Sequence, residues 1–243
     1  CQYGLISDDK FYDRSLKFTL VKNTDGKHYT FEEFKEQVKE LQTDKNDKIV
    51  LLYANNQIDQ HAQIRACKNR GYEVLVFDHV IDNHFLQQLE IKDGGVTFVR
   101  VDADTVDKLV EKDEQAESVL SEAQQNEIKE LFTKTVSAAG ASVSLRPMSP
   151  EDEPVIITRP EQMRRMREMQ SIQGAAFGDL PDFFNVVVNT NHTLIADKLT
   201  GTEDEAEREA VAQYLFSLAQ LHQGMLRGEE LEAFVKKSLS FLK

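Results

Sequence analysis

IVLLYANN, residues 49–56, is the stretch that decides the fold, because it is an apolar run that stops at two asparagines. Two similar runs follow, EVLVFD at 73–78 and VTFVRVD at 96–102, and segments with helical character separate the three. Short apolar, β-branched runs that alternate with helices are typical of a parallel sheet covered on both faces. The sequence therefore predicts a small α/β unit over residues 46–112.

The 45 residues before this unit are predicted to form a helical tail. Ser7 begins a helix that runs through Val21, Gly26 turns the chain, and the capping-box pair Thr30 and Glu33 starts a second helix. That second helix is expected to end near residue 41. Aromatic residues crowd this segment without an obvious core of their own, so we expect residues 1–45 to be the tail of a domain whose body lies upstream.

Residues 113–243 are predicted to form an α+β domain, so the chain as a whole is expected to be α/β and α+β. The expected elements are an acidic helix to about residue 136, strands at 142–146 and 155–158 that pair with each other, a strand in 183–192, and helices elsewhere. Two amphipathic helices close the chain; Thr202–Glu205 caps the first, and Gly224 and Gly228 bracket the break between them. Their apolar faces can be buried on their own domain, or two copies can meet in a four-helix bundle.

Composition excludes several classes of protein. Acidic residues outnumber basic ones 42 to 29, for a net charge of -13, and such a field repels nucleic acid. No run approaches the roughly 18–20 apolar residues of a membrane span. The two cysteines, Cys1 and Cys67, suggest a reducing cytoplasm, and Cys67 is expected to be a small buried residue. We therefore expect a cytoplasmic protein with neither nucleic acid nor membrane as a partner.

No arrangement of residues typical of catalysis is present in the sequence. The six histidines lack metal-ligand spacing, and there is no GxSxG motif. Asn55, Asn56 and Asp78 follow strands, where α/β units bind nucleotides, but no GxGxxG or GxxxxGK[ST] motif accompanies them. The sequence thus nominates no catalytic, cofactor or metal residue, and leaves a structural α/β unit and a nucleotide-binding or enzymatic module as alternatives.

A methionine-rich segment, PEQMRRMREMQSIQGAAFGDLPDFF at 160–184, is predicted to begin as a helix capped near Thr158. Met163, Met166 and Met169 are spaced by three residues, so with Ile172 they sweep across half of a helix with about 100° per residue. Arg165 falls inside this arc, and a charged residue there is hard to bury. The methionines can line a core or face water. We expect one edge of the arc to be buried and the other exposed, with Met166 or Met169 on the exposed edge.

The terminal residues carry a family resemblance. YLFSLAQLHQGMLRGEELEAFVKKSLSFL at 214–242 resembles the dimerisation helices of the bacterial ninety-kilodalton heat-shock chaperones, the HtpG family. VVVNTNHTLIADKL at 186–199, PVIITRPEQMRRMREMQ at 154–170 and FYDRSLKFTLVKNTDGKHYTFEEF at 11–34 are also similar to that family, in the same order along the chain.

The resemblance implies the end of a middle domain followed by a C-terminal dimerisation domain. The ATP-binding domain, with its ATP and Mg²⁺, is expected before Cys1, since the chain has no initiator methionine and matches none of the family's nucleotide-binding residues. This chain is therefore expected to have neither a cofactor nor ATPase activity. The Arg164-Arg165 pair departs from relatives, which puts the polarity of the methionine surface in doubt.

The implied partners are a second copy of the chain and partly unfolded client proteins. The implied client-binding residues are Met163, Met166, Met169, Ile172 and Phe177. The implied dimer contact consists of Leu215, Leu218, Leu231, Phe234, Val235, Leu239 and Leu242. The competing hypotheses are the nucleotide-binding or enzymatic module with a helical dimerisation tail, and a purely structural scaffold.

Overall fold

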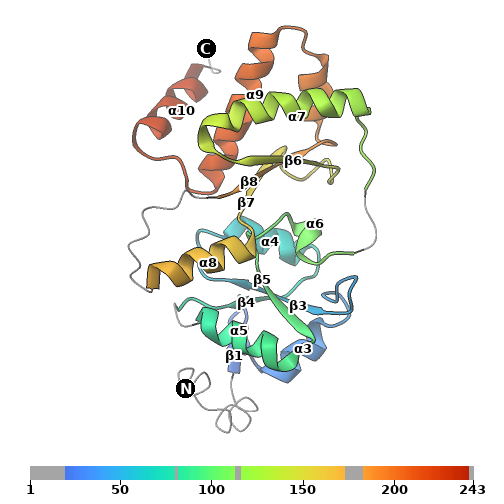
Figure 1. Cartoon of the computed structure of the whole chain (residues 1–243), viewed down its shortest axis with the longest axis vertical. Helices are drawn as coiled ribbons and strands as arrows, with labels where there is room; N and C mark the ends of the chain where they lie inside the picture. Colours follow the sequence, from blue (N-terminus) through green and yellow to red (C-terminus); the bar gives the residue numbers. More distant parts are fainter. Residues whose placement is uncertain (1–19, 80–81, 113–115, 173–182, 241–243) are drawn as a thin grey trace. The chain divides into compact units, whose positions relative to one another are not determined.

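A computed structural model of the chain describes residues 20–79, 82–112, 116–172 and 183–240 (Figure 1). The side chains of residues 82–84 and 167–172 lie outside this description. The chain divides into two compact units, Cys1–Asp113 with Arg164–Gln170, and Glu114–Met163 with Ser171–Lys243. The first unit is α/β and the second is α+β, which confirms the predicted fold class.

Three parallel strands form the centre of the first unit. They are β3 (Ile49–Ala54), β4 (Val74–Val76) and β5 (Val96–Arg100), in the order β4-β3-β5. The register places Leu52 opposite Val74 and Leu51 opposite Phe98. These strands lie in the three apolar runs that predicted the sheet.

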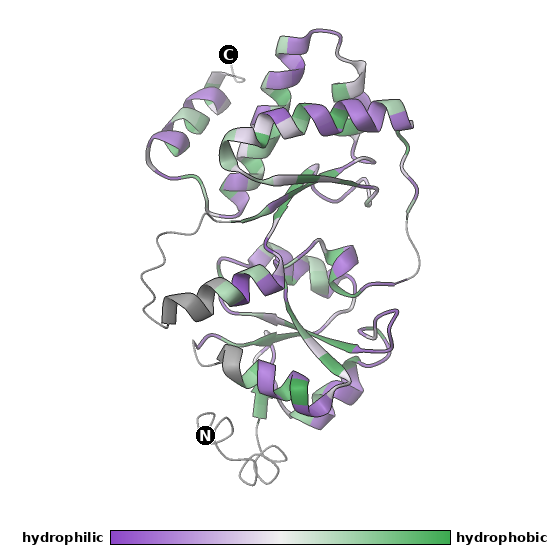
Figure 2. Cartoon of the chain, in the orientation of Figure 1, coloured by the Kyte–Doolittle hydropathy of each residue, from purple (hydrophilic) through white to green (hydrophobic). Residues whose placement is uncertain are grey.

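Helices cover both faces of this sheet, and this explains why β3 is apolar along its whole length. Leu51 and Tyr53 pack into a core with α3 (Phe31–Val38) and α5 (Asp82–Asp93). The alternate residues Val50, Leu52 and Ala54 pack into a second core with α4 (His61–Asn69) and α6 (Val106–Leu109). Figure 1 shows the two pairs of helices on opposite sides of the strands, and in Figure 2 the strands between them are mostly green, for hydrophobic.

The predicted helix through Val21 is wrong at its described end. Leu20–Lys22 is strand β1, which pairs antiparallel with β2 (His28–Thr30). The residues between them turn at Gly26, which has a φ of 80°, and an Asp-Gly turn between short extended segments favours a hairpin. Residues 7–19 of the predicted helix lie outside the described part of the chain.

The helix predicted after this turn is confirmed, but its expected lack of a core is wrong. Thr30 and Glu33 form the capping box of α3. Phe31, Phe34 and Val38 are at most 2% exposed and pack in the same core as Leu51. Phe31, Phe34 and the partly buried Tyr29 therefore belong to the core of the α/β unit itself.

The sheet of the second unit has the order β6-β8-β7. Its strands are β6 (Ser142–Arg146), β7 (Val155–Thr158) and β8 (Asn185–Asn189). Strand β8 lies parallel to β6 and antiparallel to β7, so the predicted direct pairing of β6 with β7 is wrong. The run Val186–Val188 is fully buried, as expected for the central strand of the sheet.

Helices α7 (Glu122–Val136) and α9 (Glu205–His222) pack against this sheet and against each other. A short π-helical segment, η3 (Leu194–Leu199), precedes α9, and Asp204 caps α9 by accepting hydrogen bonds from the amides of Ala206 and Glu207. After the break between Gly224 and Gly228 comes the last helix, α10 (Gly228–Ser240). The two predicted terminal helices are thus confirmed.

The methionine-rich helix is α8 (Glu161–Ile172). It begins two residues later than a helix capped at Thr158 would, because Thr158 is the last residue of strand β7 and pairs there with Asn185. From Arg164 to Gln170 this helix belongs to the first unit.

Candidate functional site: the methionine helix and the terminal helix pair

Helix α8 turns its first two arginines towards the α/β unit. Arg164 is only 9% exposed; its Nη2 donates a hydrogen bond of 2.5 Å to the hydroxyl of Tyr53, and its guanidinium lies 5.8 Å from the centre of that ring. Arg165 is bound through Nη1 to Glu90 at 2.7 Å and donates from Nη2 to the carbonyl oxygen of Phe98 at 2.9 Å. Arg165, the charged residue expected to be hard to bury, keeps 19% of its side chain exposed, whereas Arg164 is buried; both guanidinium groups have partners on the unit they face.

The two methionines in the same turn of α8 are exposed. Met163 is 38% exposed and Met166 is 47% exposed. On a helix with about 100° per residue, the midpoint of these two methionines lies about 180° from the midpoint of Arg164 and Arg165. This turn therefore reverses the usual arrangement, in which a helix buries its apolar residues and exposes its charged ones.

The other predicted client-binding residues are Met169, Ile172 and Phe177. The side chains of Met169 and Ile172 belong to the part of α8 whose side chains lie outside the description, and Phe177 lies in 173–182, outside the described residues. The methionine surface is therefore defined here by Met163 and Met166.

The terminal helices α9 and α10 meet at Tyr214. The ring of Phe234 stacks on the ring of Tyr214, with centroids 5.4 Å apart and an angle of 12° between the planes. The Tyr214 hydroxyl lies 3.2 Å from the hydroxyl of Ser238, and the ammonium of Lys237 lies 5.8 Å from the centre of the Tyr214 ring. One side of α10 is thus held against α9.

A set of large apolar side chains on this helix pair is exposed and forms what we call the terminal apolar face. Its members are 37–55% exposed: Leu218, Leu221, Leu231, Val235 and Leu239. Their spacing is three residues on α9, and four and four on α10, so each set follows one side of its helix. No residue of α10 that the structure describes is buried.

The predicted dimer residues therefore occupy three environments. Leu218, Leu231, Val235 and Leu239 lie on the exposed face, whereas Leu215 is 4% exposed and packs in the core of its own unit. Phe234 is partly buried by Tyr214, and Leu242 falls within 241–243, outside the described residues. Sequence reasoning omitted Leu221 from the contact, although its spacing of three from Leu218 places it on the same side.

The loop after β3 is closed by its own side chains. The amides of Asn55 and Asn56 both donate to Oε1 of Gln60, at 3.0 and 3.1 Å, and Oδ1 of Asn56 accepts from the amides of Ile58 and Asp59. A phosphate at the end of a strand needs free backbone amides that point at it. These residues do not fit a phosphate-binding loop.

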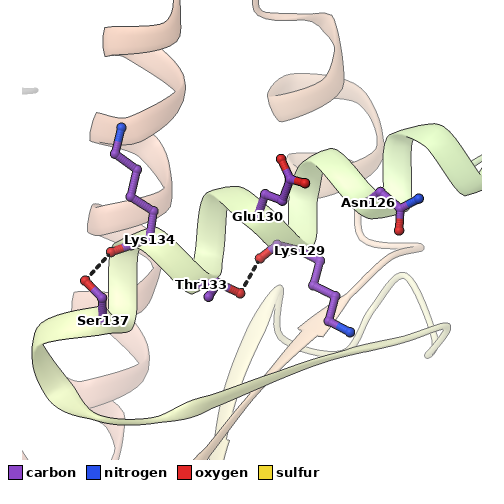
Figure 3. Close-up of a pocket in the computed structure, with 6 residues that line it drawn as sticks. All are labelled: Asn126, Lys129, Glu130, Thr133, Lys134 and Ser137. Atoms are coloured by element: carbon purple, nitrogen blue, oxygen red, sulfur yellow. Dashed lines mark hydrogen bonds between the residues drawn. The ribbon is translucent and has the colours of Figure 1, made fainter.

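A shallow depression of about 570 Å³ lies along α7 (Figure 3). Thr133 and Ser137 donate their hydroxyls to carbonyl oxygens of Lys129 and Lys134, and the ammonium of Lys134 is bound by Glu209. The side chains of Thr133, Lys134 and Ser137 are thus used within the fold, and in Figure 3 the labelled side chains do not converge on one point.

Cys67 is buried and free, as predicted, and burial raises the pKa of its thiol to about 12. It therefore stays protonated and unreactive near neutral pH. Among the described residues, no group of three or more His, Cys, Asp and Glu side chains is placed to hold a metal ion. No described helix is both long enough and apolar enough to cross a membrane.

The chain is similar to the chaperone protein HtpG of Bacteroides fragilis, with 39% identity over 208 residues, and to that of Porphyromonas gingivalis, with 37% identity over 225 residues. These matches cover 84% and 90% of this chain but 30% and 33% of the relatives, so the chain spans about a third of their length. The HtpG of Bacteroides thetaiotaomicron is 38% identical over 209 residues.

The family model described as Hsp90 protein matches residues 2–243, nearly the whole chain. Together with these relatives it shows that the chain belongs to the Hsp90 family of chaperones.

Proposed function

We propose that this chain is the C-terminal part of a cytoplasmic Hsp90-family chaperone, in which it holds partly unfolded client proteins and pairs with a second copy of itself. The methionine surface of α8 binds the clients, and the terminal apolar face binds the second copy. The relatives are named as chaperones, and this supports the general function.

The observation that carries the proposal is the reversal on α8. Scattered exposed apolar residues are ordinary on protein surfaces. It is unusual, however, for one helix to bury an arginine, here Arg164 at 9% exposed, while Met163 and Met166 stay 38% and 47% exposed. Methionine is flexible and polarisable, so its side chain adapts to contact surfaces of different shape. Such a surface suits a protein that must bind many unfolded chains.

ATP and Mg²⁺ belong to another part of the parent protein in this proposal. The amides of Asn55 and Asn56 are bound by Gln60 rather than free for a phosphate, and we expect this chain neither to bind nor to hydrolyse ATP. A reproducible rise in melting temperature on addition of ATP would instead favour the nucleotide-binding alternative.

The client surface is tested by suppression of aggregation. A chemically denatured protein is diluted into the wild-type chain or into the Met163→Asp/Met166→Asp variant, and light scattering is followed. We expect the variant to need about tenfold more protein for the same suppression, since a charge at each position opposes contact with apolar segments.

Ile58→Asp is the matched control, because Ile58 is an 87% exposed apolar residue in the loop after β3, remote from α8 and its partner Glu90 in sequence. It should suppress aggregation as the wild type does. Equal suppression by the methionine variant and the wild type would refute the proposed client surface, and would leave the structural-scaffold hypothesis standing.

A further inference from the structure

At one edge of the parallel sheet of the first unit, polar backbone groups pair with no strand in the described part of the chain. Strand β5 lies at the end of the order β4-β3-β5. The amide of Ile49 donates a hydrogen bond to the carbonyl of Gly95, and the amide of Val101 donates to the carbonyl of Tyr53. The backbone amides and carbonyls of the odd-numbered residues of β5 therefore point towards β3. In a parallel ladder alternate residues bond to the same neighbour, so the amide and carbonyl of Phe98 point away from β3, to the open edge.

Two side chains satisfy these backbone groups and also bind each other. Oε1 of Glu90 accepts from the amide of Phe98 at 2.7 Å, and Nη2 of Arg165 donates to its carbonyl at 2.9 Å. Arg165 and Glu90 complete the arrangement with an ion pair of 2.7 Å. The two side chains thus take the place of a neighbouring strand at Phe98, and an edge that is covered in this way is protected from unwanted pairing.

The neighbouring arginine adds a second point of attachment. Arg164 binds the hydroxyl of Tyr53, which is 2% exposed and packed edge-on against Phe77 at a centroid distance of 5.9 Å. A side chain held this firmly gives the helix a fixed point on β3, while Arg165 holds it on β5. Two consecutive residues attached to two strands restrict both the position of α8 and its rotation about its own axis.

We infer that Arg164 and Arg165 are positioning residues that dock α8 on the α/β unit and hold Met163 and Met166 outward. A helix that is free to roll would bury its methionines and expose its arginines, as apolar and charged residues ordinarily do. The docking stands on the structure by itself, whereas its consequence for clients rests on the proposed function. The sequence suggested that Arg164 and Arg165 would disturb the methionine surface. In this inference the same two residues keep Met163 and Met166 exposed.

Hydrogen exchange on the whole chain tests the docking. Arg165→Met removes the ion pair and the bond to Phe98, and Glu90→Gln keeps an acceptor for the Phe98 amide but removes the charge. We expect amides of α8 and β5 to exchange about tenfold faster in Arg165→Met, the equivalent of one lost charge-assisted hydrogen bond, and less so in Glu90→Gln. Arg165→Lys should give an intermediate rate, since an ammonium cannot reproduce the fork of the guanidinium.

Arg227→Met is the matched control, because Arg227 is exposed and lies outside α8. It should leave exchange in α8 and β5 unchanged. Unchanged exchange in all the Arg165 and Glu90 variants would overturn the docking.

Aggregation suppression then tests the positioning role at a temperature where every variant is folded. Arg165→Met should lose suppression several-fold although both methionines remain, and Arg165→Lys should restore part of it. Faster exchange with undiminished suppression would overturn the positioning role. If Met163→Asp/Met166→Asp also suppresses aggregation as well as the wild type does, the proposed client surface is refuted. The hydrogen-exchange rates of α8 and β5 still decide in that case whether the two arginines dock the helix.

Discussion

Helices α9 and α10 are both amphipathic and follow each other in the chain, yet only one of them has its apolar side buried. Four residues of α9 lie in the core of the second unit: Ala212, Leu215, Phe216 and Ala219. The described residues of α10 include no buried one, and Leu231, Val235 and Leu239 are 37%, 46% and 55% exposed. An amphipathic pattern therefore predicts which side of a helix is apolar, but it does not predict whether that side packs on its own domain or on another molecule.

The difference also separates two kinds of leucine that the resemblance assigns to one dimer contact. Leu215 is already covered by its own unit, so it stabilises the fold whether or not a second copy is present. Leu239 has little cover from its own chain, so its apolar surface becomes favourable only when something else excludes water from it.

The largest effect is expected from Leu215→Ala. Removal of a buried leucine side chain lowers the free energy of unfolding by about 2–5 kcal/mol, through lost transfer energy and the cavity that remains. Urea denaturation followed by circular dichroism, at a low protein concentration where copies do not associate, measures the change. The matched substitution Leu239→Ala should cost less than about 0.5 kcal/mol there. Equal losses would mean that α10 is packed as tightly as α9.

A smaller effect is expected at the contact between the two helices. Tyr214→Ala removes the stack with Phe234 and the hydroxyl contact with Ser238, together about 1–2 kcal/mol. Hydrogen exchange should show α10 opening more often while Ile128 and Phe132 of α7 stay protected. Tyr214→Phe keeps the stack and should lose only part of the effect. Protection of α10 that survives Tyr214→Ala would show that other contacts hold this helix.

The smallest effect is expected at the ion pair between Lys134 of α7 and Glu209 of α9. The hydrogen bond to Glu209 raises the pKa of Lys134 above its ordinary 10.5. A raised pKa in the folded state means that this contribution is complete below pH 10.5 and is lost as the pH rises through the folded value. Both groups face water, so Lys134→Met should barely change the melting temperature at pH 7.

The comparison between wild type and Lys134→Met across pH is the check on this ion pair. Their small difference in melting temperature should vanish above the raised pKa. A difference that grows with pH would have the wrong sign and would exclude the ion pair as its cause.

The sequence was sufficient for the parallel sheet and for both terminal helices, because continuous apolar runs and periodic stripes report directly on burial. It was insufficient for β1 and β2, which are three residues each and too short to show a pattern. The Asp25-Gly26 turn was the available signal for that hairpin. The order of the second sheet depends on a long-range contact, although the run Val186–Val188 is typical of a central strand.

The sequence named residues for the candidate site, but it did not reveal the contacts that position them. Spacing alone placed Arg165 within the apolar arc of α8. Its partners Glu90 and Phe98 precede it by 75 and 67 residues, and no local pattern reveals such a pairing. Likewise, periodicity placed Leu215 and Leu218 on one stripe, whereas their exposures of 4% and 39% depend on how α7 and the sheet pack against α9.

The central claim is that the terminal apolar face is covered by a second copy of the chain, and sedimentation velocity tests it most directly. At tens of micromolar the wild-type chain should sediment as a dimer, and Leu218→Glu or Leu239→Glu should sediment as a folded monomer, because a buried carboxylate without a partner opposes association. Ile91→Glu, a charge at an exposed apolar residue far from α9 and α10 in sequence, should remain a dimer. A wild-type chain that is monomeric at these concentrations would contradict the account.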